Sequence, residues 1–248
     1  MTTAPSSRWL KSTDWLAAHL RDPNVVAVDG SYYLSTQNRN ARAEYLAAHI
    51  PGAAFFDINK IADTSIELPH MLPGPDQFAA MAGALGIGDG NTIVVYDGSG
   101  LYSAARVWWT IRIFGAKNVF ILDGGMPKWQ AENRPVEAGE TKRKSRTFKP
   151  ALNTGAVAML GDVQMALNNR SAQLVDARSA DRFRGQVPEP RAGLRSGHMP
   201  GAFNVPFAEL VDNGTLASPE RIRKAFASGG VDLDQPVITT CEIGRAHV

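Results

Sequence analysis

Cys241 is the only cysteine in the 248-residue chain, and it directly follows the short β-branched run Val-Ile-Thr-Thr. A thiol reacts as its thiolate, and an ordinary cysteine with a pKa of about 8.5 is only slightly ionised at neutral pH. Backbone N–H groups and the start of a helix stabilise an anion, so a cysteine between a strand and a helix can become a nucleophile. On position alone, a buried and unreactive cysteine is an equally good interpretation.

The two halves of the chain repeat one pattern of polar residues. Three anchors recur after 147, 149 and 144 residues, in the pairs Asp29/Asp176, His49/His198 and Asp97/Cys241. This period is too long for a solenoid repeat and indicates duplication of a whole domain. Asp97 and Cys241 each follow a strand-like run directly, so only the second half carries a nucleophile at that position.

Short apolar runs alternate with longer amphipathic stretches. We expect strands at residues 25–28, 93–96 and 119–122, and helices at 13–19, 75–85 and 104–114, the first capped by Ser12 or Thr13. This alternation is typical of a doubly wound α/β sheet, in which ligands bind outside the carboxyl ends of the strands. We expect a first domain over residues 1–138, a basic, solvated linker over 139–156, and a second domain over 157–248.

Several segments together resemble tandem rhodanese domains. They are Cys241 after Val-Ile-Thr-Thr, the repeated His-Ile/Met-Pro-Gly-Ala segments at His49 and His198, Leu-Asp-Gly-Gly-Met-Pro-Lys-Trp at 122–129, and Asp-Ala-Arg-Ser-Ala-Asp-Arg-Phe-Arg-Gly at 176–185. The resemblance runs from about residue 9 to Cys241. It implies two tandem rhodanese-like, doubly wound α/β domains with parallel sheets, the first catalytically silent and the second carrying the nucleophile.

The resemblance also implies roles for other residues. Arg182 and Arg191, the latter closing Pro-Glu-Pro-Arg, would bind the carboxylate and carbonyl oxygen of a substrate, because a guanidinium matches a carboxylate with two hydrogen bonds. His70, in His-Met-Leu-Pro-Gly, would be a catalytic histidine. Many relatives have an acidic residue eleven positions before it, but here Asn59 stands there, so Asp63 is the candidate partner.

Other residues have simpler interpretations. A single arginine can form a surface ion pair, and a single histidine is more often structural. His49 and His198 are expected to hold turns and domain packing, and Trp108, Trp109 and Trp129 are expected in the core.

The activity implied by the resemblance is sulfur transfer from 3-mercaptopyruvate through a Cys241 persulfide, with release of pyruvate. A thiol, cyanide or a thioredoxin-like protein would accept the sulfur, and covalent catalysis of this kind needs no metal or organic cofactor. Two alternatives stay open: thiosulfate as the sulfur donor, and a non-catalytic sulfur carrier or docking module.

The last seven residues, Glu-Ile-Gly-Arg-Ala-His-Val, do not resemble the family, in which the cysteine opens a small loop of backbone N–H groups. We expect the second domain to be incomplete, truncated after Cys241, and the chain to have little or no activity.

Composition excludes several classes of partner and location. With 26 basic and 24 acidic residues the formal charge is +2, which offers no footprint for nucleic acid. No apolar run approaches the roughly 20 residues that span a bilayer, and the N-terminus lacks a signal-peptide core, so no membrane association is expected. A single cysteine suits a reducing compartment, and we expect the cytoplasm.

Overall fold

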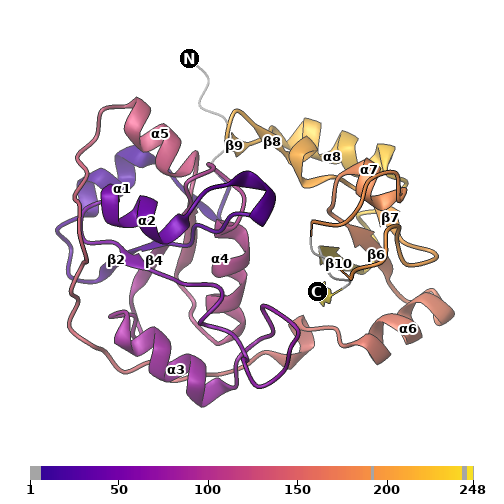
Figure 1. Cartoon of the computed structure of the whole chain (residues 1–248), viewed down its shortest axis with the longest axis horizontal. Coiled ribbons are helices and arrows are strands. Elements are labelled where there is room, and N and C mark those ends of the chain that lie inside the picture. The colour runs from indigo at the N-terminus through magenta and orange to yellow at the C-terminus, as the bar shows by residue number, and fades with distance from the viewer. Residues whose placement is uncertain (1–6, 191–192, 242–244, 248) are drawn as a thin grey trace. The chain divides into compact units, whose positions relative to one another are not determined.

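A computed structural model describes residues 7–190, 193–241 and 245–247 of the chain (Figure 1). The chain forms two compact units. The first comprises residues 1–152 with Asn213–Thr215, and the second comprises Asn153–Asp212 with 216–248. Among the described residues, no helix combines the length and the apolar character that crossing a membrane requires.

The first unit is built on a five-stranded sheet with the strand order β1-β5-β4-β2-β3, in which every neighbouring pair is parallel. Its strands are β1 (Leu10–Lys11), β2 (Val25–Asp29), β3 (Ala54–Phe55), β4 (Thr92–Tyr96) and β5 (Val119–Leu122). Its helices are α1 (Thr13–His19), α2 (Ala41–Ala47), α3 (Pro75–Ala84), α4 (Ala104–Ile113) and α5 (Gly125–Ala131), with a 3-10 turn at Ser35–Gln37.

Helices cover both faces of this sheet. On one face, Leu16 of α1 and Trp129 of α5 are fully buried against Val94 and Leu122. On the other face, α4 packs against β4 and β5 (Figure 1). The ring of Phe114, at the end of α4, stacks on Phe78 of α3. The expected strands and helices are therefore confirmed to within one residue. Ser12 caps α1 as expected, because its hydroxyl accepts a hydrogen bond from the amide of Trp15 at 3.1 Å.

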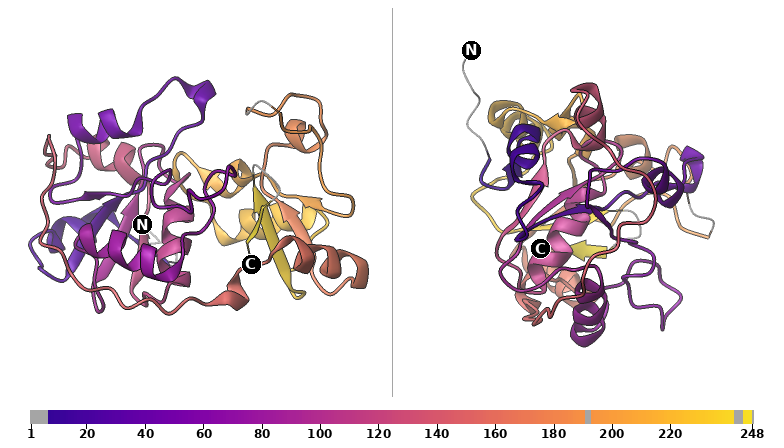
Figure 2. Two further views of the ribbon diagram at one scale, coloured as in Figure 1. Left: turned by 60° about the horizontal axis from the view of Figure 1, so that its bottom comes forward. Right: turned by 90° about the vertical axis from the view of Figure 1, so that its left-hand side faces the viewer.

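The second unit has a four-stranded sheet with the order β11-β10-β6-β7, whose strands lie side by side in the left view of Figure 2. Strands β10 (Val237–Cys241), β6 (Gln173–Asp176) and β7 (Phe203–Asn204) are parallel, whereas β11 (Arg245–His247) pairs with β10 in the antiparallel sense. The expected parallel sheets are thus present in both units, and β11 adds one antiparallel strand to the second. Strands β8 (Val211–Asp212) and β9 (Thr215–Leu216) form a separate pair.

Helices also cover both faces of the second sheet. Val163 of α6 (Leu160–Asn169) packs with Leu174 and Ile238 on one face. Ala225 of α8 (Pro219–Ser228) packs with Val175 on the other face. The short helix α7 (Ala180–Phe183) follows β6, and 3-10 turns lie at Thr154–Ala156 and Phe207–Leu210. Leu174 and Val175 are successive residues of β6, so their side chains point to opposite faces of the sheet. Both faces of β6 are therefore apolar, as in a doubly wound sheet.

The segment expected as a linker, residues 139–156, divides between the units at Leu152. The Arg143 guanidinium donates to the carbonyl of Gly52 at 2.7 Å, and that of Arg146 donates to the carbonyl of Pro23 at 2.8 Å. The Phe148 ring is buried edge-on against Phe78. Residues up to 152 are therefore attached to the first unit by the basic side chains that the sequence suggested were solvated.

Asp29 ends β2 and is buried in the first unit. Its carboxylate accepts a hydrogen bond from the amide of Ser31 at 2.9 Å. Burial nevertheless raises the pKa of Asp29 to about 6, because the charged form loses hydration, and hydrogen bonds from Ser31 and Tyr96 only partly offset this. The native state of this unit therefore binds a proton more tightly than the unfolded chain does.

This difference makes the stability of the first unit depend on pH. The unfolding free energy should fall as pH rises between about 4 and 6, by at most about 3 kcal/mol, because the unfolded state releases its proton first. Asp29→Asn should flatten this dependence. Urea unfolding followed by tryptophan fluorescence reports this unit selectively, since all five tryptophans lie in it. An equally steep fall in the variant would contradict the assignment to Asp29.

Candidate active site

Cys241 is the last residue of β10, at the carboxyl edge of the second sheet. The neighbouring strand β6 ends at the same level, because Thr240 is in register with Asp176 and the Ala177 amide donates to the Thr240 carbonyl at 3.0 Å. Cys241 is exposed, as a nucleophile that meets a substrate must be. Its predicted place at a strand end is confirmed, and the alternative of a buried cysteine does not hold.

The residues that follow β6 bring a buried cation beside this edge. The Arg178 side chain is 8% exposed, and its Nε and Nη2 atoms donate to both carboxylate oxygens of Asp176 at 2.6–3.0 Å. Its Nη1 donates to Glu189 at 2.9 Å, and its Nη2 also donates to the carbonyl of Gly197 at 2.8 Å. Sequence reasoning missed Arg178, although it lies in the Asp-Ala-Arg segment that carried the resemblance.

The charges around Arg178 are mutually stabilising. The bond to Asp176 is the main cause that raises the pKa of Arg178, and the charges of Asp176, Glu189 and Cys241 add to it. Because a charge–charge attraction acts on both partners, the guanidinium in turn favours the ionised form of Cys241. Arg178 is thus a cation that interacts with Cys241, although its own charge is shared with Asp176 and Glu189.

Arg182, expected to bind substrate, lies four residues further along the chain, in α7. Its Nη2 donates to Oε2 of Glu189 at 2.5 Å, and its Nε lies 3.4 Å from Oε1 of the same carboxylate. Glu189 thus bridges Arg178 and Arg182, and sequence reasoning missed it too. Arg191, the second expected substrate ligand, lies outside the described residues.

In the first unit, Asp97 follows β4 at the position that corresponds to Cys241. Its carboxylate is buried and accepts hydrogen bonds from the backbone amides of Ser99, Tyr102 and Ala104, each at 2.8 Å. The loop between β4 and α4 therefore forms a ring of N–H donors around an anion. The chain's own carboxylate occupies this ring.

His70 lies in a loop of the first unit with a left-handed backbone, φ +60°. Its Nε2 donates to Oδ1 of Asn59 at 2.9 Å, its ring packs edge-on against Tyr32, and its carbonyl accepts from Arg106 at 2.7 Å. Non-glycine residues rarely adopt a positive φ, so surrounding contacts must hold this conformation. The histidine is therefore fixed by its neighbours.

Asp63 is not the partner of this ring nitrogen. Its carboxylate accepts hydrogen bonds from the Ser65 hydroxyl at 2.6 Å and the Ser65 amide at 2.9 Å, which lower the pKa of Asp63. The carboxylate is thus hydrogen-bonded within its own turn, and the side chain of Asn59 accepts the hydrogen bond from the His70 ring instead.

His49, His198 and Trp129 make the local contacts expected of structural residues. His49 is fully buried, and its ring donates to the Tyr45 carbonyl at 2.8 Å and contacts Glu137 at 3.0 Å. The His198 ring donates to the Phe183 carbonyl at 2.7 Å and stacks on the Phe183 ring. Trp129 is fully buried, whereas Trp108 and Trp109 are only partly buried.

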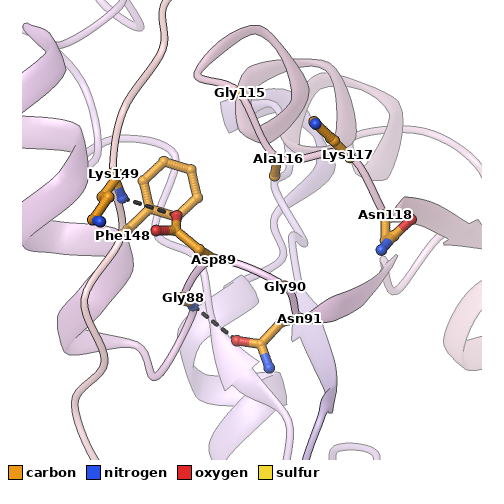
Figure 3. A pocket seen from close by; sticks show the side chains of 10 residues that line it. All are labelled: Gly88, Asp89, Gly90, Asn91, Gly115, Ala116, Lys117, Asn118, Phe148 and Lys149. Carbon is orange, nitrogen blue, oxygen red and sulfur yellow. Dashed lines mark hydrogen bonds between the residues drawn. The ribbon is translucent and has the colours of Figure 1, made fainter.

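A pocket of about 340 Å³ lies at the other end of the first sheet, before β4 and β5 begin (Figure 3). Its lining includes Asp89, Asn91, Lys117 and Lys149, and the Asp89 carboxylate accepts a hydrogen bond from the Lys149 amide at 3.0 Å. No expected site residue lines it. Among the described residues, no cluster of three or more histidine, cysteine or acidic side chains could hold a metal ion.

Comparison with known proteins places these features in a family. Residues 12–132 and 159–247 match the rhodanese-like domain. The chain is 42% identical over 240 residues to the 3-mercaptopyruvate sulfurtransferase of Escherichia coli K12, covering 96% of this chain and 85% of that protein. It is 41% identical over 245 residues to the thiosulfate sulfurtransferase of Rattus norvegicus, covering 96% and 82%.

A solved structure agrees. The crystal structure of SseA, a 3-mercaptopyruvate sulfotransferase from Escherichia coli, matches with a TM-score of 0.88 at 41% identity, over 96% of this chain and 90% of that one. The resemblance read from the repeated segments is thus confirmed across both halves. The chain belongs to the rhodanese family and contains two rhodanese-like domains.

Proposed function

We propose that this protein is a sulfurtransferase that takes sulfur from 3-mercaptopyruvate on Cys241 and passes it to a second acceptor. The observation that carries the proposal is the exposed Cys241 at the carboxyl edge of the second sheet, with the buried cation Arg178 beside it. The name of the Escherichia coli relative supports the choice of donor.

In the first step, the Cys241 thiolate attacks the sulfur atom of 3-mercaptopyruvate. An S–S bond forms while the C–S bond of the donor breaks, and the electron pair stays on carbon as the enolate of pyruvate. The enolate takes up a proton, and Cys241 is left as a persulfide. In the second step, a nucleophile removes the outer sulfur and regenerates the Cys241 thiolate.

Arg182 and Arg191 are the proposed ligands of the donor carboxylate and carbonyl oxygen. A guanidinium at each position suits a planar, negatively charged keto acid. His70 is proposed as a participant on the family resemblance, with Asn59 in place of Asp63 as the residue that orients its ring. The first domain is proposed to be catalytically silent, since Asp97 stands where Cys241 stands in the second.

Thiosulfate is the second candidate donor, because a thiosulfate sulfurtransferase is almost as similar to this chain. Its reaction with Cys241 would release sulfite and leave the same persulfide. A sulfur acceptor is needed in either case, and a small thiol, cyanide or a reduced thioredoxin-like protein has the required nucleophile. We propose the cytoplasm as the location, since a reducing compartment keeps Cys241 as a thiol.

Formation of the persulfide needs only one sulfur transfer, so it can be tested on this chain even if turnover is as slow as its sequence predicts. One equivalent of 3-mercaptopyruvate should add the mass of one sulfur atom to the protein and release one equivalent of pyruvate, and Cys241→Ser should abolish both. Intact-mass spectrometry and a pyruvate assay measure these quantities. Parallel reactions with thiosulfate rank the two donors by rate. Pyruvate release without a mass gain at Cys241 would refute the covalent route.

The role of Arg178 can be tested through the reactivity of the thiol. Arg178→Gln should slow alkylation of Cys241 by iodoacetamide near neutral pH by about five- to tenfold, because the thiolate loses a neighbouring cation. It should also destabilise the second unit by about 3–5 kcal/mol, since buried carboxylates lose their partner.

Two further variants separate these effects. Arg178→Lys keeps the charge and should retain most of the alkylation rate. Arg184→Gln removes an exposed arginine that pairs with Asp181 at the surface and should change neither quantity. Equal slowing by Arg178→Lys and Arg178→Gln would show that the charge is not what activates Cys241.

A further inference from the structure

We propose that Glu189 is a positioning residue that holds one edge of the Arg182 guanidinium and leaves the other edge for the carboxylate of the sulfur donor. This inference rests on the proposed function, because it assigns Arg182 to that carboxylate. Glu189 itself would not touch the substrate and would act through Arg182.

The two contacts between Arg182 and Glu189 use a single edge of the guanidinium. Nε and Nη2 face the two carboxylate oxygens at 3.4 and 2.5 Å. Within the described part of the chain, Nη1 of Arg182 takes part in no hydrogen bond, and the side chain is 15% exposed. A guanidinium has five N–H donors in a planar fork, so the edge formed by Nη1 remains able to bind a second carboxylate.

Glu189 is itself immobilised from the other side. Its side chain is only 1% exposed, and Oε1 also accepts from Nη1 of Arg178 at 2.9 Å. Arg178 is clamped in turn by both oxygens of Asp176, the last residue of β6. A continuous line of charged contacts therefore connects the end of β6 to α7, and it sets the orientation of Arg182 relative to the sheet edge that carries Cys241.

The charges of this network balance. The cations Arg178 and Arg182 face the anions Asp176 and Glu189. If Glu189 mattered only as a negative charge, its removal would make the site more positive and would attract anions more strongly. If it positions Arg182, its removal would release the guanidinium and weaken the binding of a carboxylate. The two roles therefore predict opposite changes in carboxylate binding when Glu189 is neutralised.

Alkylation of Cys241 in the full chain shows whether carboxylate binding becomes weaker or stronger. Iodoacetate carries a carboxylate and iodoacetamide does not, and both react with the only cysteine. The ratio of their rates reports how well the site receives a carboxylate, whereas a general loosening of the fold alters both rates together. Glu189→Gln should lower the iodoacetate-to-iodoacetamide ratio by about fivefold.

Matched variants locate the effect. Arg182→Gln should also lower the ratio, and adding Glu189→Gln to it should lower the ratio no further, because both changes remove the same oriented guanidinium. Glu209→Gln, which neutralises an exposed carboxylate of the same unit, should leave the ratio unchanged. An unchanged or raised ratio in Glu189→Gln, or full additivity in the double variant, would overturn the inference.

Arg182→Lys covers the case in which Glu189→Gln does not fold. Lysine keeps the positive charge but has no second edge, so the ratio should fall, and a wild-type ratio would overturn the inference. The alkylation needs no sulfur transfer. Loss of the proposed function would show as absence of the persulfide in the wild-type chain, while failure of the positioning role would show only in the rate ratio.

Discussion

A carboxylate buried at the end of a strand must be neutralised or hydrogen-bonded, and this constraint acts at the same place in both units. Asp29 ends β2 and Asp176 ends β6, and each accepts a hydrogen bond at 2.9 Å from the amide two residues further on. In the second unit that next residue is Arg178, whose guanidinium neutralises the carboxylate with three close contacts. In the first unit it is Ser31, whose hydrogen bonds only partly offset the burial, and the pKa of Asp29 is raised. The corresponding positions Ser31 and Arg178 therefore differ in whether they bring a cation to the end of the strand.

The second difference between the units concerns the residue that follows the central strand. Asp97 brings its own negative charge into the ring of amides from Ser99 to Ala104, so the anion in that ring is part of the fold. Cys241 offers a thiol at the corresponding position, and a thiol becomes an anion only where its surroundings favour one. Arg178 is the cation whose charge interacts with Cys241, and it is therefore the residue proposed to favour the thiolate. The cation and the nucleophile thus occur together in the second unit and are both missing from the corresponding positions of the first.

The sequence predicted features set by local pattern and missed those set by contacts across loops. Strand ends follow from apolar runs closed by polar residues, so the places of Asp97 and Cys241 at sheet edges could be foreseen. Glu189 could not, because a charged residue between two prolines suggests an exposed loop, and only the folded chain shows it buried between two arginines. Likewise Asp63 looked available to His70, but its own turn with Ser65 engages it and the amide of Asn59 takes its place. The basic residues near Arg143 suggested a solvated linker for a similar reason, since bonds to distant carbonyls leave no periodic signal.

The shared carboxylate gives a physical reason why the proposed substrate ligand Arg182 is a guanidinium and not simply a positive charge. A buried Glu189 is tolerated only with partners that satisfy both of its oxygens, and loss of either partner would leave a costly unpaired charge. Arg178 and Arg182 both donate to this carboxylate. Glu189 therefore connects the residue proposed to favour the Cys241 thiolate with the residue proposed to bind substrate. A lysine ammonium could neutralise Glu189, but it is a single point charge with no second planar edge for an incoming carboxylate. Because the two cations and two anions of this network balance, a carboxylate bound as proposed would be held by directional hydrogen bonds more than by excess charge, and a guanidinium fixed in orientation suits that task.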